Sequence, residues 1–163
     1  MEGITFRQLD PASDFPALVQ LLNKVRIQKV TAERLLEWEN NVPPDRIRRT
    51  IVAERDEGNF AGYSRLYHRP GAADGRHYFD IAVEPVWRGQ GLGTALYEDA
   101  FQAAVAYKAA ILDADVYDNC ASCLRFAKKR GFAIDRQVSP VHAASNSCKT
   151  AVPIRLPDDR VSQ

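Results

Sequence analysis

Apolar and polar residues along the chain follow two periods, one typical of strands and the other of helices. Segment 77–83 is rich in aromatic and branched residues, while from Thr94 to Tyr107 apolar side chains recur at helical intervals. The same patterns predict strands at 4–9, 49–54, 60–68, 77–83, 110–117, 132–138 and 152–156. They predict helices at 14–24, 31–40, from 91 or 93 to 107, and 121–130. This succession predicts an α/β fold, with a mixed, mostly antiparallel central sheet of six to seven strands flanked by about four helices.

The composition of the chain agrees with this predicted fold. A chain of 163 residues with 45% hydrophobic and 26% charged residues is expected to form a single globular domain, 1–163. Its net charge of +1 gives no reason to expect nucleic acid or an anionic membrane as a partner. Residues 1–10 lack the apolar core of a signal peptide, and no apolar run reaches the length of a membrane span.

Three cysteines, Cys120, Cys123 and Cys148, favour a reduced intracellular compartment over a disulfide framework, so we expect a cytoplasmic protein. Cys120 and Cys123 have the spacing of a redox motif at a predicted helix start. They form a lone pair without a second cysteine or histidine pair nearby, and the three histidines are dispersed. Neither a redox site nor a metal site is therefore expected.

The junction between the strand 77–83 and the helix that follows it carries three glycines, Gly89, Gly91 and Gly93. Without Cβ atoms they let the backbone bend and let a ligand approach amide N–H groups. The start of a helix leaves such groups unpaired and slightly positive, which suits phosphate.

Several nucleotide-binding families use glycine-rich turns of this kind, and spacing separates them. A P-loop requires Gly-Lys-Ser/Thr, whereas Gly93 is followed by Thr94 and Ala95. A dinucleotide fingerprint read from Gly89 or from Gly91 places Thr94 or Leu96 at its third glycine, although Asp113 lies on a later strand at a tolerable distance. Neither family fits.

The pattern that does fit is Arg/Gln-x-x-Gly-x-Gly, here Arg88 to Gly93, preceded by Val83-Glu84-Pro85. It resembles the GNAT N-acetyltransferase family, and the segment 124–132 with its Gly-Phe ending resembles that family's closing helix. The resemblance runs from about residue 4 to 132 and implies a single-domain GNAT fold that binds acetyl-CoA as acetyl donor. The resemblance also implies cofactor-binding residues on the strand beside the pantetheine arm, in the pyrophosphate loop and near the later helix. These residues are Ile81, Ala82, Val83, Arg88, Gly89, Gln90, Gly91, Leu92, Gly93, Thr94 and Asn119.

Acetyl transfer needs a base, because an amine attacks a thioester only after losing a proton. The resemblance implies a carboxylate on the motif strand, and Asp80 and Glu84 are the candidates. Asp80 is equally open to a salt-bridged structural role, and Glu84, beside the turn, is more typical of surface charge. A backbone N–H near 81–83 would stabilise the oxygen that gains negative charge.

The family's proton donor to the leaving thiolate cannot be carried over. It is a tyrosine four residues before the Gly-Phe glycine, and that count falls on Ala127. Tyr117, Ser122 or water are left as alternatives, with Tyr117 taken as the candidate. The same count places Cys120 where the family often has an asparagine, with Asn119 one residue away.

The resemblance therefore predicts an acyltransferase that moves the acetyl group of acetyl-CoA directly to a primary amine. The acceptor is a small-molecule amine or a peptide or protein amine, and a monomer and a homodimer both stay open. Because the tyrosine is missing, one alternative stays open: a catalytically degenerate GNAT-fold module that binds acetyl-CoA in a regulatory or interaction role.

Overall fold

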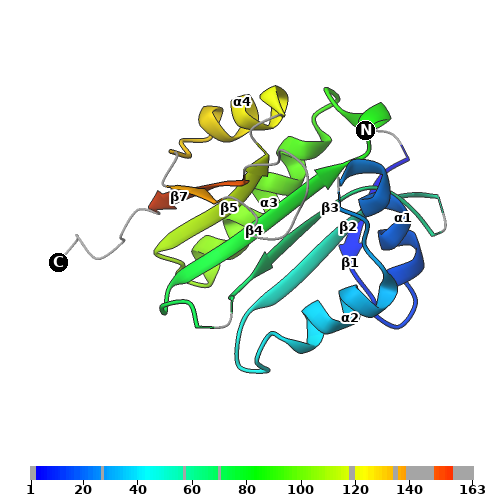
Figure 1. Ribbon diagram of the computed structural model, residues 1–163. Coiled ribbons are helices and arrows are strands. Elements are labelled where there is room, and N and C mark those ends of the chain that lie inside the picture. The colour runs from blue at the N-terminus through cyan, green and yellow to red at the C-terminus, as the bar shows by residue number, and fades with distance from the viewer. Residues whose placement is uncertain are drawn as a thin grey trace.

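The computed structural model of the chain describes residues 3–26, 28–56, 58–69, 71–117, 120–133, 136–138 and 149–155, and for 117, 136–138 and 149–155 it describes the backbone alone. Figure 1 shows the arrangement of the elements. In chain order they are β1 (Thr5–Gln8), α1 (Phe15–Val25), α2 (Ala32–Asn40), β2 (Arg48–Asp56), β3 (Asn59–Tyr67), β4 (Arg76–Val83), the 3₁₀ helix η1 (Pro85–Trp87), α3 (Leu92–Ala106), β5 (Ile111–Tyr117), α4 (Ala121–Lys129), β6 (Arg136–Val138) and β7 (Lys149–Arg155).

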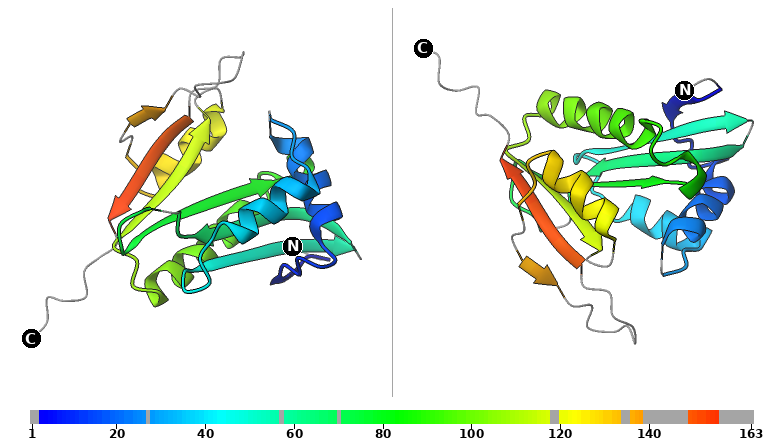
Figure 2. Two further views of the ribbon diagram at one scale, coloured as in Figure 1. Left: turned by 60° about the horizontal axis from the view of Figure 1, so that its bottom comes forward. Right: turned by 90° about the horizontal axis from the view of Figure 1, so that it is seen from above.

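The strands that the structure describes join one mixed sheet in the order β1-β2-β3-β4-β5-β7-β6. Neighbouring strands are antiparallel except β4 and β5, which are parallel and are linked by η1 and α3. Pairing between β4 and β5 covers only Arg76–Phe79 against Ile111–Ala114. Beyond Phe79 the two strands separate, and Figure 2 (left) shows β5 and β7 turning away from β4. This separation leaves the last residues of β4 paired with β3 alone within the described chain.

Helices cover both faces of the sheet, with α3 on one side of β1–β4 and α1 and α2 on the other (Figure 2, right). One core cluster joins α1 and α2 to the sheet through fully buried side chains such as Leu22 and Val52. On the opposite face, α3 and α4 pack with β3, β4 and β5 around Leu66, Leu112 and Ala104. Side chains of β4 therefore alternate between two different layers of the protein.

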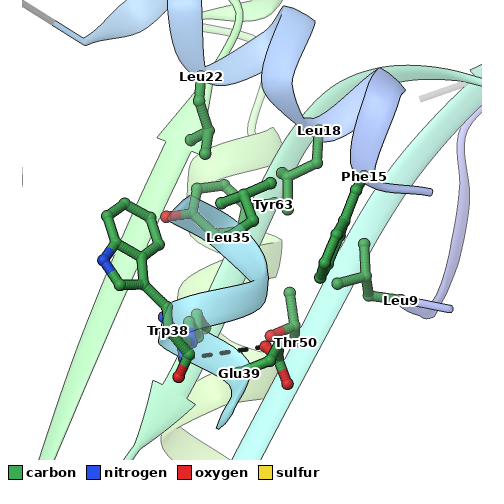
Figure 3. A pocket seen from close by; sticks show the side chains of 10 residues that line it. Leu9, Phe15, Leu18, Leu22, Leu35, Trp38, Glu39, Thr50 and Tyr63 are labelled. Atoms are coloured by element: carbon green, nitrogen blue, oxygen red, sulfur yellow. Dashed lines mark hydrogen bonds and ion pairs between the residues drawn. The ribbon is translucent and has the colours of Figure 1, made fainter. Parts of the chain in front are cut away.

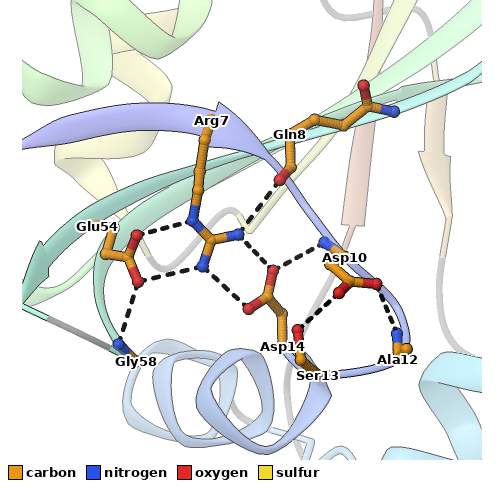
Figure 4. Close-up of polar contacts among 8 residues, drawn as sticks. All are labelled: Arg7, Gln8, Asp10, Ala12, Ser13, Asp14, Glu54 and Gly58. Carbon is orange, nitrogen blue, oxygen red and sulfur yellow. Dashed lines mark hydrogen bonds and ion pairs between the residues drawn. The ribbon is translucent and has the colours of Figure 1, made fainter.

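A polar network ties the start of α1 to the first two strands (Figure 4). The Arg7 guanidinium donates to Glu54 Oε2 at 2.7 Å and to Asp14 Oδ2 at 2.6 Å. These bonds raise the pKa of Arg7 above its usual value, and the bond from Arg7 lowers the pKa of Asp14. Asp14 occupies the N-cap position of α1 but caps no amide of that helix, because its carboxylate is held by Arg7 and by the Asp10 N–H. Thr31 does cap α2, accepting from the Arg34 N–H at 3.3 Å.

The α/β class and the mixed sheet predicted from the sequence are confirmed, and β1 to β5 and the four α-helices lie close to their predicted segments. Two local differences appear. Pro85–Trp87 forms a 3₁₀ helix that the pattern did not predict. The strand expected from Phe132 begins only at Arg136, because Phe132 is buried in the core beneath α3 and α4. No helix in the described part of the chain is long and apolar enough to cross a membrane.

A buried ion pair lies where β4 and β5 still pair. Asp113 is only 1% exposed and accepts from Arg76 through both carboxylate oxygens, with 3.1 Å between Arg76 Nη2 and Asp113 Oδ1. Asp113→Ala would remove two charge-assisted hydrogen bonds made by a buried carboxylate, so we expect a loss of about 3 kcal/mol in the free energy of unfolding, measured by urea denaturation. Asp115→Ala is the matched control. Asp115 lies on the same face of β5 but is exposed in its pair with Arg69, and its loss should cost about 1 kcal/mol or less. Equal losses in the two variants would contradict the role assigned to Asp113.

Candidate functional site

The glycine-rich segment forms a tight connection between the end of β4 and the first turn of α3. η1 turns the chain away from the sheet, and Gly89 and Gly91 then adopt positive φ angles of 76° and 88°. A side chain would be strained in that conformation, although nothing lies within 4 Å of the place where either Cβ would stand. The glycines are thus required by the backbone path, and the space above them is open.

Two side chains predicted to contact a ligand brace this loop from within. Arg88 Nε donates to the Val83 carbonyl oxygen at 3.0 Å, and Gln90 Nε2 donates to the Val86 carbonyl oxygen at 2.9 Å. Both bonds return from the loop to the chain just before it. They hold the loop in shape, and the amide groups of the loop are the candidates for contact with a ligand.

α3 begins directly after the loop, with Gly91 as its N-cap residue. The Leu92 side chain is 1% exposed and lies in the core, so only its backbone can take part in a site. A Cβ at Gly93 would meet the Phe126 ring of α4 at 3.4 Å. This is an ordinary van der Waals distance, so α4 lies close to the start of α3 and the packing does not itself require glycine at 93.

α4 also brings a cation to the loop. Arg130 Nη2 donates to the Thr94 hydroxyl at 2.7 Å, and the guanidinium lies 3.4 Å from the centre of the Phe126 ring. Partial burial lowers the pKa of Arg130, and within the described residues it forms no ion pair. First-turn amides of a helix have no acceptor inside that helix, and here they lie beside an arginine. Together they fit a phosphate-bearing ligand.

The strand that leads into the loop offers its backbone. Ile81, Ala82 and Val83 pair with β3 on one side, but β5 has already separated on the other. Their outward N–H and C=O groups therefore face away from any described strand, apart from the Val83 carbonyl, which accepts from Arg88. A ligand with amide groups of its own could pair with this edge.

Asp80, the first candidate base, lies on β4 one residue beyond the last pair with β5. Its Oδ2 accepts from the hydroxyl of Tyr63 and from Arg26 Nη2, and Arg26 Nη2 also donates to Tyr63 Oη at 2.6 Å. Tyr63 is 2% exposed; burial and the neighbouring Asp80 charge raise its pKa well above 10. Three polar groups from α1, β3 and β4 thus meet at one point. The sequence pattern alone does not indicate Tyr63 or Arg26, because both are distant from Asp80 in the chain. The pairing of β3 with β4 and the position of the end of α1 bring them together.

Glu84, the second candidate, is not a surface charge as the sequence suggested. It is 9% exposed, and its Oε1 accepts from Lys24 Nζ at 2.7 Å. The Glu84 N–H donates to the Ala61 carbonyl oxygen, which draws this residue into the protein as β4 ends. Its other oxygen, Oε2, is buried without a hydrogen-bond partner in the described structure. The residue ties α1 to the base of the loop.

The expectation of unpaired cysteines is wrong for two of the three. Cys120 and Cys123 form a disulfide at the start of α4, and Cys148 lies outside the described residues. Ala127 is buried in the core beneath α4, so its position supplies no proton donor. The Tyr117 backbone ends β5, but its side chain and Asn119 fall outside the described part. The described residues contain no cluster of three metal-binding side chains.

A space of about 290 Å³, part of it open to solvent, lies between α1, α2 and the sheet (Figure 3). The Tyr63 ring lines it, and Figure 3 shows the hydroxyl of Tyr63 pointing toward Trp38. At its polar end, Arg65 Nε is buried without a hydrogen-bond partner, although Arg65 Nη2 lies 3.8 Å from Glu39 Oε1. The full lining is Leu9, Phe15, Leu18, Leu22, Leu35, Trp38, Glu39, Thr50, Tyr63 and Arg65.

Comparison with known proteins places this geometry in context. Over 92 residues the chain is 34% identical to L-2,4-diaminobutyric acid acetyltransferase of Nocardia farcinica (strain IFM 10152), a match that takes in 54% of this chain and 47% of that protein. The match thus spans about half the length of this curated relative.

Two solved structures have the same fold over nearly their whole length. YncA from Salmonella typhimurium, determined with its cofactor acetyl-CoA, gives a TM-score of 0.73 at 19% identity over 98% of each chain. The ribosomal-protein-alanine N-acetyltransferase from Brucella melitensis gives 0.75 at 21% identity over 93% of this chain and 99% of that one. At such identities the likeness concerns the fold alone. Residues 15–132 match the acetyltransferase (GNAT) family, and since this is most of the chain, the protein belongs to that family.

Proposed function

We propose that the protein transfers the acetyl group of acetyl-CoA directly to a primary amine. One observation carries the proposal: the glycine loop leads into α3 just after the end of β4, and no described strand pairs with the outer edge of β4 from Asp80 onward. The phosphate site and the exposed strand edge follow one another along the chain. They fit a donor in which a pyrophosphate is joined to an arm that contains amide groups. Acetyl-CoA, the donor of the family, has both.

In this proposal the donor is held mainly by backbone groups. The amides after Gly91 and the Arg130 guanidinium would bind the pyrophosphate, and the edge at 81–83 would pair with the arm. Donors of this kind in a fixed array also stabilise an oxygen that becomes negative during transfer. Among the predicted residues, Arg88 and Gln90 would act indirectly by holding the loop.

Asp80 is the base in the proposed reaction. The acceptor ammonium would give a proton to its carboxylate, and the neutral nitrogen would form a bond to the acetyl carbon. The carbon–sulfur bond would then break to release the CoA thiolate, the nitrogen would lose its second proton to give the amide, and the thiolate would take up one proton to become the thiol. Arg26 contacts the same oxygen of Asp80 that such a proton would reach, so this pair has to rearrange when an acceptor binds. The group that protonates the thiolate remains a prediction, with Tyr117, Ser122 and water as candidates.

A second function has a specific observation in its favour. Ala127 offers no acid, and Asp80 is engaged by Arg26, so the protein could bind acetyl-CoA without transferring its acetyl group. Such a module would act in a regulatory or interaction role. The acceptor is open in either case, because the relatives named above act on a small amino acid and on a ribosomal protein alanine.

Calorimetric titration with acetyl-CoA, followed by an assay for CoA thiol release with a broad amine panel, separates the two functions. The enzyme should bind acetyl-CoA and release thiol with at least one acceptor, whose acetylated product is identified by mass spectrometry. Binding without thiol release on any acceptor would favour the regulatory module. No binding at all would remove both.

A further inference from the structure

We infer that Cys120 and Cys123 form a thiol–disulfide exchange site whose substrates are low-molecular-weight thiols. An incoming thiolate attacks Cys123, and Cys120 leaves as a thiolate at the start of α4. The inference goes beyond acetyl transfer and does not depend on it. The spacing of the cysteines in the sequence did not predict a redox site, and the observation that changes this is the bond between the two sulfurs.

The position of the bridge gives it a small part in holding the fold together. Its cysteines are three positions apart in the chain, and both lie at the first turn of α4. A disulfide constrains the unfolded chain more as the ring that it closes grows longer, so this short ring stabilises the fold less than a bridge between distant elements does. Cys123 is exposed and Cys120 is half-buried, so a small thiol can reach the bond in the folded protein. Exposed bridges are among those that exchange readily.

The two sulfurs have different surroundings, and the difference assigns their roles. Cys120 is the N-cap residue of α4, and its bonded sulfur caps no amide of that helix. As a thiolate it would lie beside the unpaired N–H groups of the first turn and the positive end of the helix dipole, which stabilise a negative sulfur. The Ser122 hydroxyl, 3.5 Å from Cys120 Sγ, can donate to it as well. A stabilised thiolate is the better leaving group, so attack is favoured at Cys123, the more exposed sulfur.

Opening of the bridge takes two steps. A thiolate forms a bond to Cys123 Sγ, the bond between the two cysteines breaks, and Cys120 leaves with the electron pair. A second thiolate then attacks the sulfur of the first, forms a disulfide with it and releases Cys123 as a thiolate. The protein has gained two electrons, which two molecules of thiol have supplied by becoming one disulfide. Two protons then convert the cysteine thiolates to thiols, and the reverse steps close the bridge.

This chemistry has two sources of thiol, a soluble thiol such as glutathione and the CoA that the proposed acetyl transfer releases. Cys123 precedes Phe126 by three residues, so the two side chains share one side of α4. The Phe126 ring lies 3.4 Å from the Cβ position at Gly93, in the first turn of α3. The exchange site is therefore about one helical turn from the residue that packs beside the glycine loop.

A redox titration tests whether the folded protein opens and closes the bridge. The full chain with Cys148→Ser retains only the two cysteines of the bridge. It would be equilibrated with reduced and oxidised glutathione in varying ratio, alkylated and analysed by mass spectrometry. The protein should convert fully between disulfide and dithiol while its circular dichroism spectrum stays that of the folded state. A bridge that opens only in denaturant, or whose opening unfolds the protein, would overturn the inference.

The dependence of the opening rate on thiol concentration distinguishes the two sources. With glutathione the rate should rise in proportion to concentration. A rate that saturates with CoA, and that acetyl-CoA inhibits, would identify CoA held in its own site as the thiol, whereas a proportional rise with both would identify free thiols in general. If the proposed acetyl transfer fails, the glutathione arm still tests the exchange site. No opening by either thiol would overturn the inference.

Trapping shows which sulfur is attacked. Opening by glutathione in the presence of iodoacetamide should leave glutathione on Cys123 and the alkyl group on Cys120, located by fragmentation of the peptide that contains both. Ser122→Ala should slow opening roughly 2- to 10-fold, because it removes a hydrogen bond to the leaving thiolate. Ser13→Ala, which removes a hydroxyl bonded to Asp10 before α1, is the matched control and should leave the rate unchanged. Glutathione on Cys120, or an unchanged rate in Ser122→Ala, would overturn the assignment of Cys120 as the leaving sulfur and with it the inference.

Discussion

Gly91→Val should weaken acetyl-CoA binding at least 100-fold in a calorimetric titration. Gly91 is the N-cap residue of α3 and has a φ of 88°, where a β-branched side chain is strongly disfavoured. The loop would have to rotate out of this conformation, which would turn the amides after Gly91 away from the phosphates. Losing two charge-assisted hydrogen bonds of about 1.5 kcal/mol each gives a change of roughly 100-fold.

A control variant has to distinguish the effect of backbone strain on stability from the loss of acetyl-CoA binding in Gly91→Val. Gly71 has a φ of 74° and, like Gly91, nothing within 4 Å of its Cβ position, but it lies in the connection between β3 and β4, before the start of β4. Gly71→Val should therefore lower the melting temperature by a similar amount and leave the Kd for acetyl-CoA unchanged. If Gly91→Val binds acetyl-CoA as the wild type does, the phosphate site is elsewhere.

Asp80→Asn should lower kcat roughly 10²- to 10⁴-fold, the usual contribution of a general base, with little change in the Kd for acetyl-CoA. The amide keeps the size of the carboxylate but can neither take a proton nor neutralise Arg26. Steady-state thiol release and a separate titration with acetyl-CoA measure the two effects independently.

Glu84→Gln is the matched comparison for this variant. Glu84 is buried and bound to Lys24, so its loss should lower stability while kcat stays within a few-fold of the wild type. A loss of kcat in Glu84→Gln with full activity in Asp80→Asn would reverse the assignment of the base.

The sequence predicted the parts of the site that depend on local chemistry. Glycine is needed at 89 and 91 because of the backbone angles there, and such a need is visible as spacing in the chain. The periods of the strands and helices likewise reflect which face of each element is buried, as at Val52 and Leu112.

Contacts between distant segments could not be predicted in this way. The bond between Arg26 and Asp80 joins residues 54 positions apart, and it depends on how α1 ends above the β3–β4 register. Glu84 looked like a surface charge because nothing near it in the chain shows that Lys24 reaches it. The disulfide of Cys120 and Cys123 is local, but the odd number of cysteines and the presumed compartment argued against it.

Within the described residues the outer edge of β4 is unpaired at 81–83, so the donor and the acceptor would be recognised by different parts of the chain: the donor by main-chain groups and the acceptor by side chains. On the proposed function, the donor is recognised by main-chain groups at 81–83 and after Gly91, and most substitutions leave such groups in place. The acceptor would be recognised by side chains, Asp80 among them, and a single codon change can replace a side chain. Descendants of this scaffold could therefore acquire new acceptors one residue at a time without losing the acetyl donor.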